Sequence, residues 1–191
     1  MKSIILASAS PRRKELLQQI GIKFEVEPSK CHEDLIFGMK PHVFAREMSL
    51  KKARFVAGRH KNSVVIAADT IIVIDGQILG KPHTEQEALK ILELINGKCH
   101  SVITGFSLID SDSNITVSNS VETKVYFKQL TLPEMEAYVG TGEPLDKAGA
   151  YAIQGLGAVM VEKIEGDYFN VMGLPLCTMT EALKEFGIKV L

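Results

Sequence analysis

A run of five apolar residues at positions 64–68 constrains the fold of this 191-residue chain more than any other feature. Uninterrupted apolar runs of this length are typical of strands buried on both faces, as in sheets that helices cover. Asp69 and Thr70 follow the run directly. The sequence therefore predicts a buried central strand that ends at Asp69, and ligands of open α/β sheets bind at the carboxyl ends of such strands.

The segments around this strand alternate between strand and helix patterns. A short apolar strand at 4–7 leads through a serine-rich turn into a helix at 11–20, for which Ser10 is a favourable N-cap, Pro11 suits the first position and Gly21 is the stop signal. Further helices are expected at 41–58, 84–95, 132–139 and 175–186, and further strands at 24–26, 71–74, 77–79, 100–109, 116–127 and 158–164. We therefore predict an α/β fold with a mixed, twisted sheet and flanking helices, in a single domain of residues 1–191.

The charge and cysteine content exclude several classes of protein. With 22 Lys and Arg against 23 Asp and Glu the net charge is −1, so no overall field favours nucleic acid or an acidic membrane. The apolar opening is too short for a signal peptide, and no run approaches the roughly 18 apolar residues of a membrane span. The three widely spaced cysteines fit reduced thiols. We expect a cytoplasmic protein with neither nucleic acid nor membrane as a partner.

Two arginines, Arg12 and Arg13, occupy the first turn of the first predicted helix. Their charge is unfavourable there, because the positive end of a helix dipole disfavours a cation by roughly 0.3 to 1 kcal/mol. Together with the Ser8 hydroxyl and the free N–H groups of the helix, their guanidinium groups would suit the oxygens of a polyphosphate. The alternative is that both arginines point into water or pair with an acid such as Glu15.

Four further residues are candidates for chemistry. Asp69 would hold a divalent metal or activate water as a general base, unless it only caps a turn. Lys52 and Lys81 would contact phosphate, unless they are ordinary surface lysines. Glu33, in "CHEDL", would add a metal ligand, unless its loop is merely exposed and acidic. Neither a P-loop nor a dinucleotide-binding glycine motif is present.

Near the C-terminal end, the polar and glycine-rich stretch at 140–157 lacks both helical and strand periodicity. It predicts a long loop, and long loops in compact domains are usually functional.

Four motifs, "LASASPRRKELL", "AADTIIVIDGQILGKP", "EPLDKAGAYAIQG" and "GDYFNVMGLPL", occur in the order and spacing of one family. On these residues the chain resembles, over nearly its whole length, the Maf family of nucleoside triphosphate pyrophosphatases, also called septum formation proteins. The resemblance implies an inosine triphosphatase-like fold with two lobes around a cleft, and often a homodimer. It also implies hydrolysis of a nucleoside triphosphate to the monophosphate and pyrophosphate with a divalent metal, Mg or Mn.

The resemblance also implies roles for individual residues. Asp69 falls at the proton acceptor of the family. The substrate-specificity positions match Arg12, Thr70 and Gln154; the phosphate pocket matches Ser8, Arg13, Lys52 and Lys81; and the metal site matches Glu33 with Asp69. Whether Asp69 acts as general base or metal ligand stays open.

Residues 147–155 follow the family members that act on dTTP and UTP, which are linked to house-cleaning of nucleotide pools and to septum formation. Ala152 stands where a glycine is expected, which matters only if the backbone there needs a positive φ. Two alternatives remain: a 7-methylguanosine triphosphate pyrophosphatase, and a nucleotide-binding regulator of cell division with little turnover. Full retention of Ser8, Arg12, Arg13, Asp69 and Lys81 argues against the regulator, because a protein that only binds would not need the acid.

Overall fold

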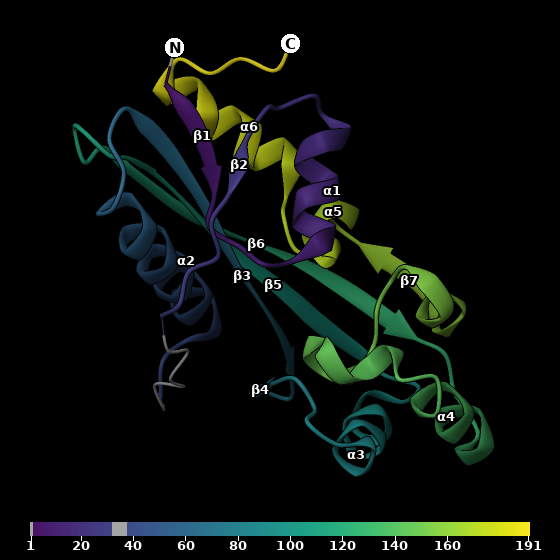
Figure 1. Ribbon diagram of the computed structural model, residues 1–191. Coiled ribbons are helices and arrows are strands. Elements are labelled where there is room, and N and C mark those ends of the chain that lie inside the picture. Colours follow the sequence, from purple (N-terminus) through teal and green to yellow (C-terminus); the bar gives the residue numbers. More distant parts are fainter. Residues whose placement is uncertain (1, 32–37) are drawn as a thin grey trace. The chain divides into compact units, whose positions relative to one another are not determined.

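The computed structural model describes residues 2–31 and 38–191 (Figure 1). The predicted metal ligand Glu33 lies outside these residues. Among the described helices, none has the length and apolar character needed to cross a membrane.

The described strands form one mixed sheet, in which the hydrogen-bonded order is β2-β1-β3-β5-β6-β7 and β4 pairs with β3. β1 is parallel to both β2 and β3, whereas β4 is antiparallel to β3 and β7 to β6. The prediction of an α/β fold with a mixed sheet is confirmed. The strands are β1 (Ser3–Leu6), β2 (Glu25–Val26), β3 (Ser63–Ile74), β4 (Gln77–Leu79), β5 (Cys99–Asp110), β6 (Thr116–Phe127) and β7 (Val161–Glu165).

The helices begin and end close to their predicted limits, but one helix and the start of one strand differ from the prediction. The helix α5 was not predicted, and the strand expected from residue 158 begins only at Val161 because residues 155–160 form a 3-10 helix that starts at Gly155, where φ is 68°. The α-helices are α1 (Pro11–Gln19), α2 (Pro41–Ala57), α3 (Glu85–Ile95), α4 (Leu132–Val139), α5 (Tyr168–Met172) and α6 (Leu176–Leu183). The 3-10 helices are η1 (Glu143–Asp146), η2 (Ala148–Ala150), η3 (Gly155–Met160) and η4 (Lys184–Phe186).

The strand prediction around Asp69 is wrong in one respect. β3 does not end at Asp69 but continues to Ile74, because its second half pairs with β4 across a turn in which Asp75 and Gly76 have φ of 49° and 77°. The parallel pairing with β1, however, stops at Ile66. Asp69 therefore lies inside a strand, three residues beyond the end of its parallel pair.

The chain divides into two compact units. Unit 1 comprises Met1–Asp69, Thr104–Val121 and Gly173–Leu191, and unit 2 comprises Thr70–Ile103 and Glu122–Met172.

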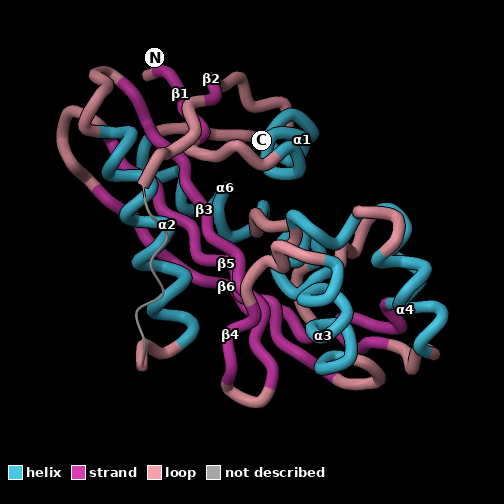
Figure 2. The backbone as a smooth tube through the Cα atoms, turned by 60° about the horizontal axis from the view of Figure 1, so that its bottom comes forward, coloured by secondary structure: helices cyan, strands magenta, loops and turns pink. Residues whose placement is uncertain are grey.

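In unit 1, helices cover both faces of the sheet. α2 lies on one face and α1 and α6 lie on the other, as both views show (Figures 1 and 2). Alternate residues of β1 and β3, including Ile5, Val65 and Ala67, pack with Ala53 and Val56 of α2 in one buried cluster. This period-two alternation decides which side chains of β3 face α2.

In unit 2, a second buried cluster joins α3, α4 and the loop at 140–157 to the strands. Leu92 of α3, Tyr138 of α4, Phe127 of β6 and Tyr151 of the loop all belong to it. The long loop predicted from the sequence is therefore not exposed along its whole length, because its middle is part of the core. Its turns are η1, η2 and the start of η3.

The packing of α2 on β5 depends on Gly105. A Cβ atom at this position would lie 2.2 Å from the backbone C and O of Ala45 and 2.5 Å from the backbone N of Arg46. Gly105→Ala is expected to lower the free energy of unfolding by about 2 kcal/mol, because neither backbone segment can yield without moving the helix. Thermal unfolding measures this loss. Gly58→Ala is the control, since its Cβ would meet only the backbone O of Arg54 at 3.5 Å, and an equal loss there would contradict the packing argument.

Candidate functional site

Asp69 of β3 and Lys52 of α2 form a buried ion pair in unit 1. Asp69 has the same strand parity as Val65 and Ala67, so its side chain points toward α2. The Nζ atom of Lys52 donates a hydrogen bond of 2.6 Å to Oδ1 of Asp69. The side chains are only 9% and 11% exposed, respectively. The carboxylate is thus held in one orientation by a cation from the facing helix.

The sequence contains a signal for this pair that the prediction did not use. Lys52 falls on the apolar face of α2, in register with Ala45, Met48, Ser49 and Val56, all of which are buried. A lysine on the buried stripe of an amphipathic helix needs a partner, because burying an unpaired charge is costly. The alternative of an ordinary surface lysine is therefore wrong for Lys52, whereas its predicted contact with phosphate is not tested.

Arg13 is fixed by hydrogen bonds within unit 1. Its Nε donates to the carbonyl O of Gly173 at 2.8 Å, and its Nη1 donates to Oγ of Ser8 at 3.2 Å. The same Ser8 hydroxyl accepts from the backbone N–H of Ser10 at 3.2 Å. The alternative in which Arg13 points freely into water is therefore wrong. Ser8 and Arg13, predicted together as phosphate-binding residues, are in contact at the start of α1.

Arg12 behaves differently from its neighbour. It is half-buried, and within the described part of the chain its guanidinium makes neither a hydrogen bond nor an ion pair. Its position follows Pro11 in the first turn of α1, where Ser10 caps the helix by accepting from the backbone N–H of Arg13. The structure thus leaves the charge of Arg12 available at a helix N-terminus, while that of Arg13 is anchored.

The residues predicted in unit 2 are linked through one loop contact. The backbone N–H of Gly149 donates to the carbonyl O of Gly80 at 3.1 Å, and a Cβ on Gly149 would lie 2.3 Å from Cδ1 of Ile72. Lys81 follows Gly80 directly, and Thr70 shares the strand face of Ile72. The loop at 140–157 therefore packs against the strand that carries Thr70 and against the backbone next to Lys81. Lys81 itself is exposed.

The loop that carries Gln154 is held by the carboxylate of Glu143 and the hydroxyl of Tyr138, two residues for which the sequence predicted no role. The Glu143 carboxylate accepts from the backbone N–H of Leu156 at 3.1 Å and of Gly157 at 3.0 Å, and from the Tyr138 hydroxyl at 2.9 Å. Burial alone would raise the pKa of Glu143, but these hydrogen bonds outweigh it and keep that pKa below its ordinary value. The signal was available, since Glu143 opens the motif "EPLDKAGAYAIQG".

A buried hydrogen bond holds Tyr151, which lies three residues before Gln154 in the same loop. The Tyr151 hydroxyl and Nε2 of His100 are 2.7 Å apart, and both side chains are buried. Burial lowers the pKa of His100 to about 4, so the ring is neutral at pH 7. Ala152, which stands where the family resemblance leads one to expect glycine, has no positive φ, so its methyl group causes no backbone strain.

The side chains around Asp69 bear on the divalent metal that the resemblance implies. Among residues 2–31 and 38–191, no three His, Cys, Asp or Glu side chains cluster as metal ligands. Mg²⁺, however, is usually held by one or two carboxylates together with substrate phosphates and water. The Asp69 carboxylate, held in place by Lys52, fits that mode of binding, in which substrate phosphates supply further ligands.

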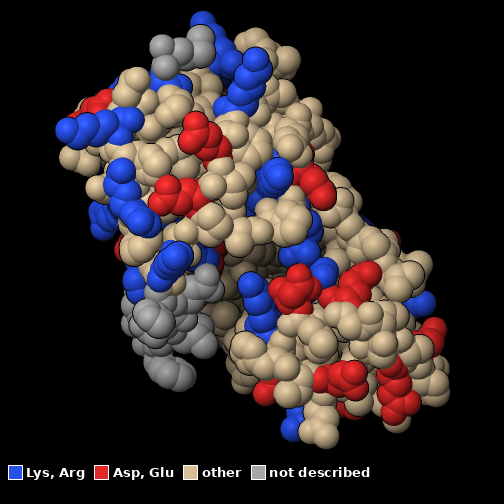
Figure 3. Space-filling model, viewed as in Figure 1, with Lys and Arg blue, Asp and Glu red and all other residues tan. Residues whose placement is uncertain are grey.

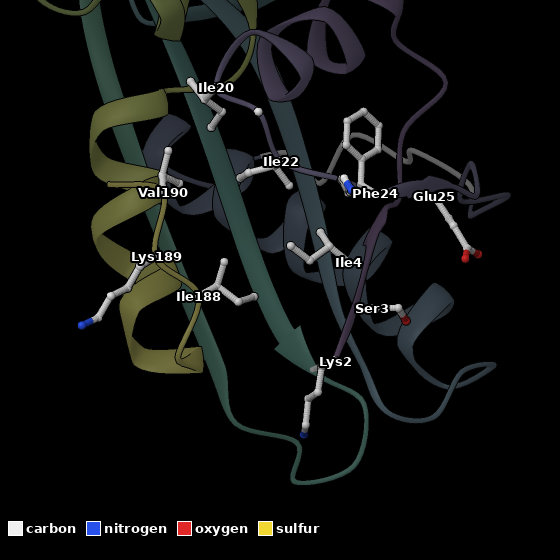
Figure 4. Close-up of a pocket in the computed structure, with 12 residues that line it drawn as sticks. Lys2, Ser3, Ile4, Ile20, Ile22, Phe24, Glu25, Ile188, Lys189 and Val190 are labelled. Carbon is white, nitrogen blue, oxygen red and sulfur yellow. The ribbon is translucent and has the colours of Figure 1, made fainter.

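A cavity of about 550 Å³ in unit 1 lies beside the N-terminal end of β1 (Figure 4). Its lining combines aliphatic and charged side chains and comes from the start of β1, from residues 20–25 and from residues 188–190. None of the candidate residues lines it, so it does not belong to the site. On the face drawn in Figure 3, basic and acidic side chains are interspersed, in keeping with the net charge of −1.

Comparison with known proteins identifies the family. A family model described as Maf-like protein matches residues 3–186. A "dTTP/UTP pyrophosphatase" from Methanococcoides burtonii is 50% identical over 191 residues, covering 100% of this chain and 98% of the relative. Proteins with the same description from Moorella thermoacetica and Methanosarcina barkeri are 44% and 48% identical, again over 100% of this chain and over 98% and 97% of their own lengths. The chain therefore belongs to the Maf family.

Proposed function

We propose that this protein is a dTTP/UTP pyrophosphatase, which hydrolyses these triphosphates to the nucleoside monophosphate and pyrophosphate and so cleans the nucleotide pool. Relatives at 44–50% identity over the full length of the chain carry this description. The observation that carries the proposal is the buried Lys52–Asp69 pair, with 2.6 Å between Nζ and Oδ1. A protein that only binds a nucleotide would not need a carboxylate fixed in this way.

Asp69 is the proposed proton acceptor. Hydrolysis requires a water molecule to attack a phosphorus atom and to lose a proton as it does so, and an ionised carboxylate can take that proton. The hydrogen bond from Lys52 to Oδ1 holds the Asp69 carboxylate in place and leaves Oδ2 as the oxygen that would take the proton. Asp69, with Glu33, would hold the divalent metal, Mg or Mn, which when bound neutralises phosphate charge.

Cationic and hydroxyl groups would stabilise the charge that develops on the leaving pyrophosphate. In unit 1 these are Ser8 and Arg13, which the contact with Gly173 keeps in place, and Lys52. In unit 2 it is Lys81. Preorganised donors of this kind lower the barrier because they need no rearrangement as the charge develops.

Arg12, Thr70 and Gln154 are the proposed substrate-specificity residues. The Gln154 amide offers one donor and one acceptor group, which suits the edge of a pyrimidine base. The guanidinium of Arg12 has no protein partner among the described residues, so it is available to bind a ligand.

We further propose that both units belong to one pyrophosphatase domain of residues 1–191, that the protein is a homodimer, and that it acts in the cytoplasm, where its substrates are made. Light scattering on the purified protein tests the dimer.

Pyrophosphate release from a panel of triphosphates tests the function. With Mg or Mn, we expect turnover of dTTP and UTP at least about tenfold faster in kcat/KM than that of ATP and GTP, a difference of about 1.4 kcal/mol. 7-Methylguanosine triphosphate and CTP complete the panel. Preference for 7-methylguanosine triphosphate would place the protein in the other substrate class, and absence of any turnover would favour the regulator.

A further inference from the structure

We propose that Glu143 is a positioning residue for base selection, which holds the segment 152–157, and with it Gln154, in one conformation. The inference rests on the proposed function, since it takes Gln154 as the residue that contacts the base. It adds a residue that would touch neither the substrate nor the metal.

The Glu143 carboxylate binds the far end of this segment with both oxygens. Oε2 accepts from the backbone N–H of Leu156 at 3.1 Å, and Oε1 accepts from that of Gly157 at 3.0 Å. Two adjacent N–H groups on one carboxylate fix the direction of the peptide that follows Gln154 and Gly155. Hydrogen bonds to a charged acceptor are also stronger than those between neutral groups.

Tyr138 connects Glu143 to the near end of the segment. Its hydroxyl donates to Oε1 of Glu143 at 2.9 Å and accepts from the backbone N–H of Ala152 at 3.3 Å. The phenol is 7% exposed and comes from α4, so it has a rigid support. Gln154 is therefore flanked on both sides by backbone groups tied to the same pair of side chains.

Two glycines allow the close approach that these bonds require. A Cβ on Gly155, where φ is +68°, would lie 2.7 Å from Oε2 of Glu143, and a Cβ on Gly157 would lie 2.3 Å from the carbonyl O of Ala152. Because neither glycine has a side chain, the backbone of the segment can approach the Glu143 carboxylate closely.

Apolar packing contributes little to the order of this segment. Of the larger apolar residues in this segment, Leu156 is 57% exposed and Ile153 is only half-buried. A segment without a buried apolar anchor keeps its conformation through polar contacts, and here these converge on Glu143 and Tyr138. Because a displacement of about 1 Å in a positioned group can cost as much as 100-fold in rate, loss of the carboxylate should change how well Gln154 discriminates between bases.

The test compares Glu143→Ala with a matched control, Glu134→Ala. Glu134 lies in the same unit and also accepts two hydrogen bonds, from the backbone N and Oγ1 of Thr131 at 2.7 and 2.9 Å, but at the start of α4. Steady-state kinetics with dTTP, UTP and GTP give kcat and KM for each protein. Glu143→Gln, which keeps one acceptor oxygen, and Tyr138→Phe, which removes the link to Ala152, are the conservative variants.

For Glu143→Ala we expect the ratio of kcat/KM for dTTP to that for GTP to fall about tenfold, mainly through a higher KM for dTTP. The ratio should be intermediate for Glu143→Gln and Tyr138→Phe and unchanged for Glu134→Ala. An unchanged ratio in Glu143→Ala, or an equal fall in Glu134→Ala, would overturn the proposal.

Amide hydrogen exchange separates failure of this inference from failure of the proposed function. The N–H groups of Leu156 and Gly157 should lose protection in Glu143→Ala and keep it in Glu134→Ala, with or without nucleotide. Protection that persists in Glu143→Ala would overturn the inference even if dTTP is hydrolysed. If wild-type protein cleaves no triphosphate, the proposed function fails first, the base-selection role fails with it, and the exchange data still show whether Glu143 holds the segment.

Discussion

Asp69→Asn is expected to lower kcat for dTTP by about 1,000-fold while leaving the fold intact, since general acid–base catalysis contributes typically 100- to 10,000-fold. Asparagine has the shape of aspartate, and its carbonyl oxygen can still accept from Lys52, so the buried contact at 2.6 Å is replaced rather than lost. What disappears is the negative charge that would accept the proton or hold the metal. Pyrophosphate release under saturating dTTP and Mg measures the loss.

Asp75→Asn is the matched control for this prediction. Asp75 lies in the exposed turn directly after β3, with φ of 49°, a conformation that asparagine also tolerates. Its replacement should leave kcat within about twofold, because surface substitutions away from special features have small effects. Activity of Asp69→Asn comparable to that of Asp75→Asn would show that Asp69 is neither the proton acceptor nor a metal ligand of this site.

Lys52→Met is expected to lower the free energy of unfolding by about 3 kcal/mol, because removal of one partner of a buried ion pair leaves the other charge without compensation. Methionine has nearly the length of the lysine stem and preserves its apolar contacts on α2, so the loss reports on the charge. Equilibrium unfolding in urea measures it, with pyrophosphate release as a second readout that should also fall.

Two comparisons make this prediction specific. Lys51→Met changes the neighbouring, exposed lysine and should alter stability by no more than about 0.5 kcal/mol. In the Asp69→Asn background, Lys52→Met should cost less than in the wild type, and the difference is the coupling energy of the pair. If Lys52→Met costs the same in both backgrounds, the ion pair contributes nothing to stability, contrary to our interpretation.

Local signals in the sequence were sufficient for most of the elements. Ser10 and Pro11 start α1 as predicted, Thr84 caps α3 by accepting from the N–H of Glu87, and Asp75-Gly76 forms the predicted tight turn. Each of these features depends on groups within about one turn of chain, so residue type and spacing carry the information. The motifs around them were also enough to indicate the Maf family, which the comparisons confirm.

The partners of the site residues could not be predicted in this way, because they come from distant parts of the chain. Arg13 binds the carbonyl of Gly173, 160 positions away, and Lys52 meets Asp69 only because β3 turns its odd-numbered face toward α2. No spacing within the sequence specifies such contacts.

The same distinction explains the incorrect strand end at Asp69, as pairing with β4 keeps β3 extended through its polar residues. By itself, the sequence determined the family, the kinds of elements and the residues that can carry chemistry. Only the tertiary structure decided which of those residues are buried, which charge faces which, and that Glu143 holds the segment of Gln154, because these depend on packing between elements rather than on neighbours along the chain.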